Sequence, residues 1–372
     1  MNKNLDILFK EINKYKIKFF TGVPDSVLKS FSNLINSNKY QNLIASNEGS
    51  AVGIAAGYYL TTKKTPVVYL QNAGLGNIIN PVLSLIHKDI YEIPMIFIIG
   101  WRGDKYKKDE PQHIPQGKKT EDLLKIIDIP YFIIKKNGNK NQLKFKKGFE
   151  LNQSKKKSVA FLIERDSFLD EEKIDKINKN NNLMNRKEVI ESIIKYAKKD
   201  LPIIATTGYT SRELISIETE NTSKQRYFLN VGAMGYASSI ALGMCLGSKK
   251  RFLCIDGDGS MIMHMGSLTN IGISKINNLV HFVINNGVHD SVGGQENAAK
   301  SLNLSNIAKA CGYQKAIRID NKKKLEFFLK NLTKEKSSVF VEVLTKKGSS
   351  GKLLRPSLPT LISKSLFMKN FS

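Results

Sequence analysis

Short apolar runs alternate with polar turns and helix-like segments along the whole chain. Apolar runs of about four to eight residues, bounded by Gly, Pro, Asn or Asp, are typical of buried strands. In the first half they span residues 16–22, 41–46, 65–70, 93–101, 129–135 and 158–165. In the second half they open the stretch 201–214 and span 251–256, 279–284 and 338–344. The pattern predicts an α/β fold of mainly parallel sheets with helices on both faces.

A polar segment rich in charged residues and Asn interrupts this alternation at residues 171–187. A chain of 372 residues is long enough for roughly two to three domains that each bury a core. The order of strand, loop and helix is similar on both sides of the segment. We therefore predict a first domain over 1–170, a linker over 171–187, and a second domain of the same architecture over 188–372.

The composition is ordinary for a soluble globular protein, with 41% hydrophobic and 24% charged residues. No apolar run approaches the roughly 20 residues of a membrane-spanning helix, and the N-terminus lacks the apolar core of a signal peptide. The three cysteines, Cys245, Cys254 and Cys311, are far apart in apolar segments. This spacing indicates neither a disulfide framework nor a zinc site. We expect reduced core cysteines, a cytoplasmic location and no membrane partner.

The net charge of +25 raises the question of a nucleic-acid partner. Only 8 of the 58 basic residues are Arg, and the Lys residues are scattered through every polar segment. Nucleic-acid sites concentrate basic residues on one face and interleave them with aromatics. We therefore expect no nucleic acid, although a positive field would steer a small, multiply anionic substrate.

Two polar turns that follow apolar runs indicate a metal site. Gly257, Asp258 and Gly259 follow the run 251–256, and Asn285-Asn286 follows the run 279–284. Carboxyl ends of neighbouring parallel strands meet at one edge of a sheet, where such folds bind ligands. A carboxylate, an amide oxygen and a backbone carbonyl are hard oxygen ligands that suit Mg²⁺ carrying a diphosphate. A GDG turn alone is common, so the spacing and the preceding strands carry this inference.

Glu48 marks a second site candidate in the first half of the chain. It follows the predicted strand 41–46 and precedes a helical segment, 51–62, that is dense in Ala and Gly. Small residues allow close packing, which would place Glu48 near the domain interior. On position alone, Glu48 is also explained as an acidic residue favoured at a helix N-terminus.

The spacing from GDG to NN resembles the magnesium and thiamine-diphosphate motif of thiamine-dependent enzymes. Nearly the whole chain resembles the phosphonopyruvate decarboxylase family. The matching stretches are FFTGVPDSVL, SNEGSAVGIAAGYYL, VYLQNAGLGNIINPVLSL, IIGWRGDKYKKDEPQHIPQGKKT, GYTSREL, VGAMGYASSIALG, DGDGSMIMHMGSL and NNGVHDSVGGQ. The resemblance implies a pyrimidine-binding domain followed by a diphosphate-binding domain, and a homodimer or larger assembly with the cofactor at the subunit interface.

The same resemblance assigns roles to individual residues. Asp258, Asn286 and the carbonyl of Val288 are expected to bind Mg²⁺, and Glu48 is expected to hydrogen-bond the aminopyrimidine of thiamine diphosphate. Met234 is expected beneath the cofactor, although it is also explained as a core Met. Further cofactor contacts are expected from Gly74, Asn77, Thr210, Ser211, Gly232, Gly257, Gly259 and Ser260. The hydroxyl residues among them are equally suited to helix capping.

The expected reaction is decarboxylation of 3-phosphonopyruvate to phosphonoacetaldehyde and CO₂. Asp25, His113 and His289 are the candidates for proton transfer; the two histidines are placed on polar loops, His113 within a long loop over 102–120. His264 and His281 are assigned to the core, and His87 is left unassigned. Substrate contacts are expected from Arg102, Lys118, Ser291 and Gln295, with Arg102 favoured for a bidentate contact to the phosphonate.

Two other readings remain open at this point. One is decarboxylation of sulfopyruvate or another anionic 2-oxo acid. The other is a non-catalytic polyanion-binding protein, which the presence of Glu48, Asp258 and Asn286 argues against. Glu296-Asn297 replaces the Pro-Thr expected after the GGQ motif, and the tail follows the family only loosely.

Overall fold

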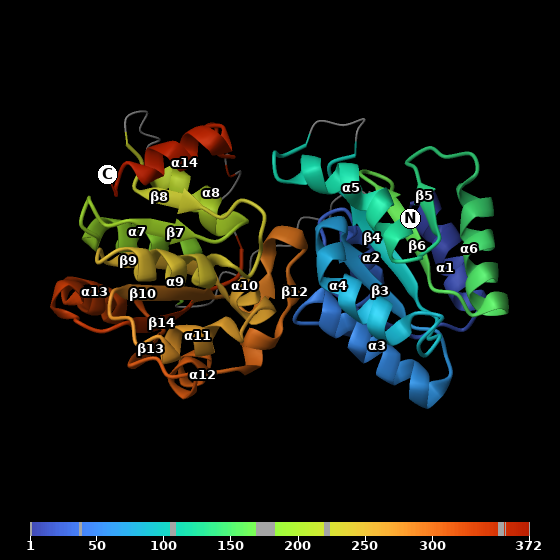
Figure 1. Cartoon of the computed structure of the whole chain (residues 1–372), viewed down its shortest axis with the longest axis horizontal. Coiled ribbons are helices and arrows are strands. Elements are labelled where there is room, and N and C mark those ends of the chain that lie inside the picture. Colours follow the sequence, from blue (N-terminus) through green and yellow to red (C-terminus); the bar gives the residue numbers. More distant parts are fainter. Residues whose placement is uncertain are drawn as a thin grey trace. The chain divides into compact units, whose positions relative to one another are not determined.

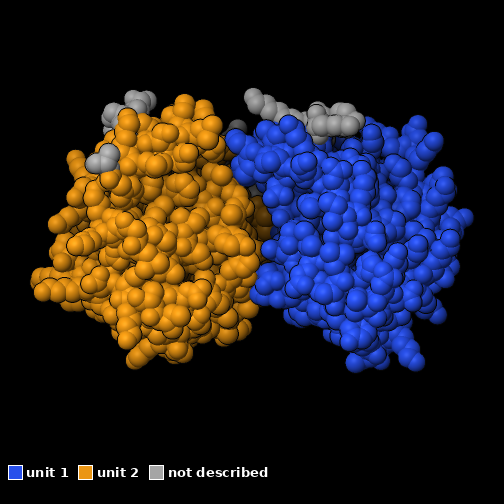
Figure 2. Space-filling model, in the orientation of Figure 1, with its two compact units in different colours: residues 1–174 blue, residues 175–372 orange. Residues whose placement is uncertain are grey.

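The apolar runs form parallel strands in the computed structural model of the chain (Figure 1). The structure describes residues 2–36, 39–104, 109–168, 183–218, 224–348, 353 and 355–371. The chain divides into two compact units, Met1–Ile174 and Asp175–Ser372, shown in blue and orange in Figure 2. Residues 171–182 of the predicted linker lie outside the described residues. Its last two residues, 186 and 187, belong to a helix and not to a linker.

Unit 1 contains a six-stranded parallel sheet in the order β2-β1-β3-β4-β6-β5. Its strands are β1 (Phe19–Gly22), β2 (Gln41–Ile44), β3 (Val67–Gln71), β4 (Ile96–Trp101), β5 (Tyr131–Ile134) and β6 (Val159–Glu164). Its helices are α1 (Lys3–Lys14), α2 (Lys29–Ile35), α3 (Glu48–Thr62), α4 (Leu75–Pro81), α5 (His113–Ile126) and α6 (Asn141–Lys155). In register, Phe19 lies opposite Gln41, and Gln71 lies opposite Gly100.

Helices cover both faces of this sheet, which is why its central strands are apolar throughout. Val68 and Phe97 point into a core with α3, α4 and α5. Their neighbours Val67 and Ile96 point the other way, into a core with α1, α2 and α6. The side chains alternate because successive residues of a strand face opposite sides.

Unit 2 contains a second six-stranded parallel sheet, in the order β13-β14-β10-β9-β7-β8. Its strands are β7 (Ile203–Ala205), β8 (Tyr227–Leu229), β9 (Phe252–Gly257), β10 (Leu279–Asn285), β13 (Lys315–Ile319) and β14 (Val339–Leu344). A separate antiparallel hairpin pairs β11 (Val288–His289) with β12 (Gln295–Glu296). Its helices are α7 (Arg186–Tyr196), α8 (Tyr209–Ile217), α9 (Ala237–Gly247), α10 (Asp258–Met263), α11 (Ser267–Ile273), α12 (Leu304–Ala310), α13 (Lys322–Lys330) and α14 (Thr360–Met368).

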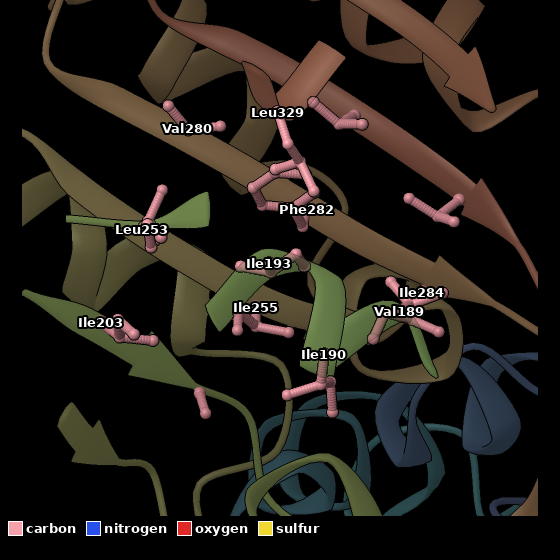
Figure 3. Packing of buried hydrophobic residues seen from close by; sticks show 14 of the residues in the cluster. Val189, Ile190, Ile193, Ile203, Leu253, Ile255, Val280, Phe282, Ile284 and Leu329 are labelled. Carbon is pink, nitrogen blue, oxygen red and sulfur yellow. The ribbon is translucent and has the colours of Figure 1, made fainter. Parts of the chain in front are cut away.

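The second sheet is also buried on both faces. Figure 3 shows one face, where Phe282 and Ile284 of β10 belong to the same apolar cluster as Ile190 and Ile193 of α7. Residues of α8 and α13 complete this core. On the opposite face, residues of α9, α10, α11 and α12 pack against alternate residues of the same strands, such as Val283. Each unit therefore has its own core on each side of its own sheet.

The two sheets share one strand order. Counted from one to six within each sheet, unit 1 reads 2-1-3-4-6-5 and unit 2 reads 5-6-4-3-1-2, the same order seen from the opposite edge. The predicted α/β class, with mainly parallel sheets and helices on both faces, is confirmed. The expectation of one architecture in both halves is also met.

Helix α5 contradicts part of the predicted long loop over 102–120, because the helix begins at His113. The polar residues of this stretch favoured a loop in the sequence, and Pro115 lies in the first turn of the observed helix. A proline in the first turn of a helix, however, removes no intrahelical hydrogen bond. Thr120 and Leu124 are buried along the helix and hold it against the unit. The loop prediction is therefore wrong for residues 113–120.

Three further features bear on the predictions. None of the helices in the described part of the chain is long and apolar enough to cross a membrane. Cys245 and Cys254 are buried and Cys311 is partly buried, and all three are free thiols. His289 lies in strand β11, so its predicted placement on a loop is wrong.

Candidate functional site

In unit 1, residues singled out from the sequence gather at the carboxyl edge of the sheet. β1 lies between β2 and β3, so the chain passes from β1 to its neighbour β2 on one side and then crosses to β3 on the other side. Open parallel sheets bind ligands at such a switch point. Asp25 follows β1, Glu48 follows β2, and Gln71 ends β3. Three neighbouring strands therefore deliver polar side chains to one edge.

Glu48 is the first residue of α3 and is only 5% exposed. The helix is capped by Asn47, whose side chain accepts a 2.9 Å hydrogen bond from Ser50 N, so Glu48 is not the cap. Glu48 Oε2 accepts a 2.7 Å hydrogen bond from Asn77 Nδ2. A Cβ at Gly74 would lie 2.4 Å from Glu48 Oε1, so only glycine leaves room for the carboxylate there. The structure thus brings Glu48, Gly74 and Asn77 together.

Asp25 is fully buried beside the end of β3. Its Oδ1 accepts a hydrogen bond from Gln71 Nε2, and its Oδ2 accepts one of 2.9 Å from Val27 N. Burial raises the pKa of Asp25, against the lowering effects of Gln71 and Arg102. A carboxyl group with a raised pKa holds a proton closer to neutral pH than an ordinary Asp does.

The guanidinium of Arg102, at the end of β4, is already engaged within unit 1. Its Nε donates to Asp109 Oδ2 at 2.8 Å and its Nη2 to Asp109 Oδ1 at 2.5 Å. Its Nη1 donates to Ser26 Oγ at 3.2 Å. Burial acts to raise the pKa of Asp109, but Arg102 outweighs it and holds that pKa well below its usual range. Arg102 therefore presents its bidentate face to a carboxylate of its own chain. Lys118 is exposed on α5, and His113 begins that helix.

In unit 2, Asp258 occupies the corresponding edge, directly after β9. It is 5% exposed, and its two carboxylate oxygens each accept a 2.7 Å hydrogen bond, from Gly259 N and from Gly287 N. Burial nevertheless raises the pKa of Asp258 to about 6. The bond to Gly287 ties Asp258 to the turn that follows β10. The GDG and NN motifs therefore meet, as their placement on neighbouring strands requires.

Both the oxygen and the nitrogen of the Asn286 side-chain amide form hydrogen bonds. Its Oδ1 accepts a 3.1 Å hydrogen bond from Val288 N, and its Nδ2 donates to Asp290 Oδ2 at 2.7 Å. Asp290 in turn lies 3.2 Å from a guanidinium nitrogen of Arg186, which is itself bound to the buried Glu213 at 2.8 Å. This buried network fixes the orientation of the amide at the turn.

Hydroxyl groups pack around the start of α10. Ser260 Oγ lies 2.8 Å from Thr206 Oγ1 and accepts a 3.1 Å hydrogen bond from Gly235 N. Ser211 Oγ donates to the Thr206 carbonyl. Thr210 is buried beside it in the first turn of α8. These hydroxyls link the ends of β7 and β9, the strands that flank the switch point of the second sheet.

The turn that carries Gly232 and Met234 lies beside this group. Met234 is partly exposed, Gly232 is exposed, and Met234 N donates a 3.0 Å hydrogen bond to the Gly232 carbonyl. His264, which the sequence assigned to the core, is only partly buried and packs on Tyr236 with ring centroids 4.5 Å apart. The core assignment of His264 is therefore only partly right.

The β11–β12 hairpin places His289 directly against α10. A Cβ at Gly259 would lie 2.7 Å from the His289 ring carbon Cε1. Burial lowers the pKa of His289 to about 4, so its imidazole is neutral near pH 7. Gln295 is buried opposite His289 in the hairpin, whereas Ser291 is exposed at its turn.

A second cluster lies beneath this edge, formed by Cys254, Asp256 and His281. Their ligand atoms lie within 4.8 Å of one another, and among the described residues this is the one such group of three. Asp256 Oδ2 lies 3.7 Å from His281 Nε2, and His281 Nδ1 lies 2.9 Å from the Tyr313 hydroxyl. Asp256 Oδ1 accepts from Gly257 N at 2.8 Å, which anchors the strand end before Asp258. The sequence predicted Cys254 and His281 to be buried, but not that they meet.

The donor set at the turns of unit 2 is suited to a magnesium diphosphate. Asp258 supplies a buried carboxylate, Asn286 an amide oxygen, and Val288 is buried beside them with its backbone carbonyl. All three are hard oxygen ligands, and Mg²⁺ prefers such ligands. The residues present therefore match the ion and the diphosphate that the sequence resemblance implies.

Several residues that hold the site were not singled out from the sequence. They are Gln71, Asp109, Arg186, Thr206, Glu213 and Asp290, together with Asn72, which bonds the backbone of Arg102, and Asn230, which bonds the backbone of Ala233. Gln71, Asn72, Thr206 and Asn230 end a strand or directly follow one, so a search of every strand end for polar residues would have found them. Asp290 also directly follows a strand, β11, and begins a short 3₁₀ helix, whereas Asp109 lies in an irregular segment.

Comparisons with known proteins identify the family of the chain. The model of the N-terminal TPP binding domain of thiamine pyrophosphate enzymes matches residues 3–124, and that of the C-terminal TPP binding domain matches residues 208–343. The phosphonopyruvate decarboxylase of Streptomyces viridochromogenes is 32% identical over 308 residues, covering 79% of this chain and 76% of that protein. The chain belongs to the thiamine-diphosphate-dependent decarboxylases.

Two other members of the family illustrate its range. The phosphonopyruvate decarboxylase of Streptomyces hygroscopicus is 32% identical over 308 residues, covering 79% of this chain and 75% of that protein. The sulfopyruvate decarboxylase of Methanosarcina acetivorans is 25% identical over 360 residues, covering 91% of this chain and 89% of that protein. As a member of this family, the protein is a carboxy-lyase that acts on a 2-oxo acid. Its cofactor is thiamine diphosphate, which is also called thiamine pyrophosphate or TPP.

Proposed function

We propose that this decarboxylase converts 3-phosphonopyruvate to phosphonoacetaldehyde and CO₂, with Mg²⁺ and thiamine diphosphate. The observation that carries the proposal is the 32% identity to two phosphonopyruvate decarboxylases over 79% of the chain. The sulfopyruvate enzyme of M. acetivorans is 25% identical over 91% of the chain, and separate sulfopyruvate decarboxylase subunits are 32–38% identical but match only 34–43% of it. The positive net charge of +25 supports an anionic substrate, because it raises the local concentration of multiply charged anions.

In this proposal unit 2 holds the metal and the diphosphate. Asp258, Asn286 and the carbonyl of Val288 bind Mg²⁺, and Asp290 keeps the Asn286 amide oriented through its 2.7 Å hydrogen bond. The hydroxyls of Thr210, Ser211 and Ser260 line the same edge. When bound, thiamine diphosphate supplies an electron sink for the electron pair that CO₂ leaves behind.

Unit 1 supplies the groups that hold and move protons. Glu48 exchanges a proton with the pyrimidine ring nitrogen, and Asn77 keeps its carboxylate in place. Asp25 is the favoured donor of the proton that replaces CO₂ on the substrate carbon, since its raised pKa allows it to carry one. His289 is less suited to that role because its imidazole is neutral. His113, at the start of α5, remains a further candidate.

The candidate contacts to the phosphonate differ in how free their side chains are. Arg102 is paired with Asp109, so its bidentate face is free for substrate only if Asp109 moves away. Lys118 is exposed and has a long, flexible side chain. Ser291 and Gln295, on the β11–β12 hairpin, remain proposed substrate contacts. The net charge of +25 adds a general attraction for anions that does not depend on one fixed pair.

Sulfopyruvate is the alternative substrate, supported by the relative from M. acetivorans. The test is a coupled assay in which an aldehyde reductase reports product formation from phosphonopyruvate, sulfopyruvate and pyruvate. We expect kcat/KM for phosphonopyruvate to exceed the other two by at least about tenfold, which corresponds to roughly 1.4 kcal/mol in transition-state binding. A higher kcat/KM for sulfopyruvate would replace the proposed substrate while leaving the reaction class intact.

We also propose a homodimer or larger assembly in which unit 1 of one chain and unit 2 of another hold the two ends of the cofactor. The support is the division of the predicted contacts between the two units, with Glu48 in one and Asp258 in the other. A two-fold dimer would then contain two equivalent sites.

A further inference from the structure

The β11–β12 hairpin and the residue that follows it carry buried amide groups, and the proposed function has not used the amide of Asn297. Gln295 in strand β12 and Asn297, directly after that strand, are 6% and 9% exposed, while Glu296 between them is exposed. The backbone of Asn297 is still extended (φ −114°, ψ 172°), and residues two apart in extended backbone share a face. Gln295 and Asn297 therefore point inward together with His289, which is paired with Gln295 across the hairpin.

Polar atoms on this inner face lack hydrogen-bond partners. Among the described residues, Gln295 Nε2, Gln295 Oε1 and Asn297 Nδ2 are buried and have none. A buried polar group left unpaired costs about 1–3 kcal/mol, so native structures contain few of them. Three such atoms on one face of a short hairpin point to a ligand that pairs with them.

Asn297 is the better defined of the two amides. Its Oδ1 accepts a 2.9 Å hydrogen bond from Ala299 N, which fixes the direction of the amide and aims Nδ2 the opposite way. Its backbone N donates to the Gly287 carbonyl at 2.9 Å, so it is anchored to the turn that carries Asn286. The Asn297 side chain is therefore a fixed helix cap, and its Nδ2 is a hydrogen-bond donor without a partner.

That donor faces the start of α10. Asn297 Nδ2 lies 3.5 Å from the position that a Cβ of Gly259 would occupy. The Asn297 amide lies close enough to Asp258 to help lower the pKa of that carboxyl group. Its Nδ2 nevertheless forms no hydrogen bond with the Asp258 oxygens. Both oxygens of Asp258 already accept backbone N–H groups. The donor is thus beside the metal ligand without being committed to it.

We propose that Asn297 is a further binding residue of this site, whose Nδ2 donates a hydrogen bond to an oxygen of the magnesium-bound diphosphate. The inference rests on the proposed use of Asp258 as the metal ligand, and it adds a residue outside the GDG and NN motifs. An anionic oxygen is the acceptor that a buried, neutral amide donor beside a metal site pairs with most strongly. Gln295 extends the same inward face.

The test compares Asn297→Asp, Asn297→Ala and Glu296→Ala in the full-length protein. Asn297→Asp keeps the shape and the oxygen that caps residues 298–301, but it replaces the donor with a second carboxylate. Calorimetry measures binding of inorganic diphosphate with Mg²⁺, and of thiamine diphosphate with Mg²⁺, to protein freed of metal. A hydrogen bond to a charged group predicts that both ligands bind on the order of 10- to 100-fold more weakly to either Asn297 variant.

Glu296→Ala is the matched control, because Glu296 lies next to Asn297, is 65% exposed and pairs with the exposed Lys300. It is expected to bind both ligands like the wild type. Wild-type affinity in Asn297→Asp would show that Asn297 serves only as a cap and would overturn the inference. Tighter Mg²⁺ binding in that variant would overturn it as well. Failure of the wild type itself to bind thiamine diphosphate would instead refute the proposed function.

Discussion

Asn77 Nδ2 donates a 2.7 Å hydrogen bond to Oε2 of Glu48, across 29 residues of sequence. Glu48→Gln keeps an oxygen that can accept this bond, but the variant can no longer take up a proton as a carboxylate does. We expect turnover to fall by at least about 100-fold, the lower range for loss of an acid–base group. Thermal unfolding and binding of Mg²⁺–thiamine diphosphate should stay close to those of the wild type. Turnover near the wild-type rate would remove Glu48 from the proton transfer.

Gly74 offers a test of the space around the same carboxylate. In Gly74→Ala the new methyl would lie 2.4 Å from Glu48 Oε1, so the carboxylate must shift. We expect kcat to fall by about tenfold or more, since small displacements of a catalytic group are costly. Gly76→Ala is the control, because a Cβ at Gly76 meets nothing within 4 Å. Equal kcat values for the two variants would contradict a steric role of Gly74.

Asp290 is expected to act on the metal through Asn286. Asp290→Ala removes the acceptor of the Asn286 amide, and loss of such supporting groups typically weakens metal binding by about 10- to 100-fold. The measurement is the Mg²⁺ concentration that gives half-maximal activity and half-maximal cofactor binding at fixed thiamine diphosphate. Asp290→Asn keeps an acceptor and should recover most of the affinity. An unchanged Mg²⁺ requirement in Asp290→Ala would leave the network a purely structural role.

Cofactor binding should release protons from Asp258. Its pKa in the metal-free protein is raised to about 6, and Mg²⁺ binds the deprotonated carboxylate. At pH 6 about half of the molecules carry this proton, so binding releases about half a proton, falling to nearly none at pH 8. Below pH 6 the affinity should drop toward tenfold per pH unit.

Calorimetry in buffers of different ionisation enthalpy measures this release. The protons that free thiamine diphosphate loses to Mg²⁺ are measured separately and subtracted. Asp258→Asn provides a control without the titrating group. Equal proton release at pH 6 and pH 8 would mean that the carboxylate is already ionised before the metal arrives.

Subunit mixing tests whether two chains share a site. Glu48→Gln and Asp258→Ala should each be inactive alone. In a mixed dimer with shared sites, one of the two sites has both native residues. Random exchange at equal concentrations makes about half of the dimers mixed, so about a quarter of wild-type activity should return. Absence of recovery after exchange has been verified by mass spectrometry of differently tagged chains would refute the shared site.

The parallel strands and the edge that carries the site were predictable from the sequence. Buried strands are recognisable in a sequence as apolar runs. Because ligands bind at the carboxyl ends of parallel strands, Glu48 and Asp258 were expected at these edges, and the structure has them there. The two motifs GDG and NN had to meet because their strands are neighbours. These inferences need only local pattern and topology.

The contacts that hold the site were not predictable in the same way. The pairs Asn77–Glu48, Gln71–Asp25 and Arg186–Asp290 join residues 29, 46 and 104 positions apart. Such pairs depend on helix packing and side-chain rotamers, which a single sequence does not specify. Helix α5 was missed for a local reason, since the polar residues of this stretch resemble a loop, and Pro115 lies in the first turn, where a helix tolerates proline.

The repeated strand order has a consequence for synthesis on the ribosome. Every strand of the first sheet is contained in residues 19–164, and every strand of the second lies after residue 202. The strands of each sheet therefore all come from one half of the chain and pair with one another. Domains fold as units, the N-terminal one first, so unit 1 can complete its core while unit 2 is still being translated. The six apolar strands of unit 1 therefore do not have to stay unpaired while unit 2 is synthesised.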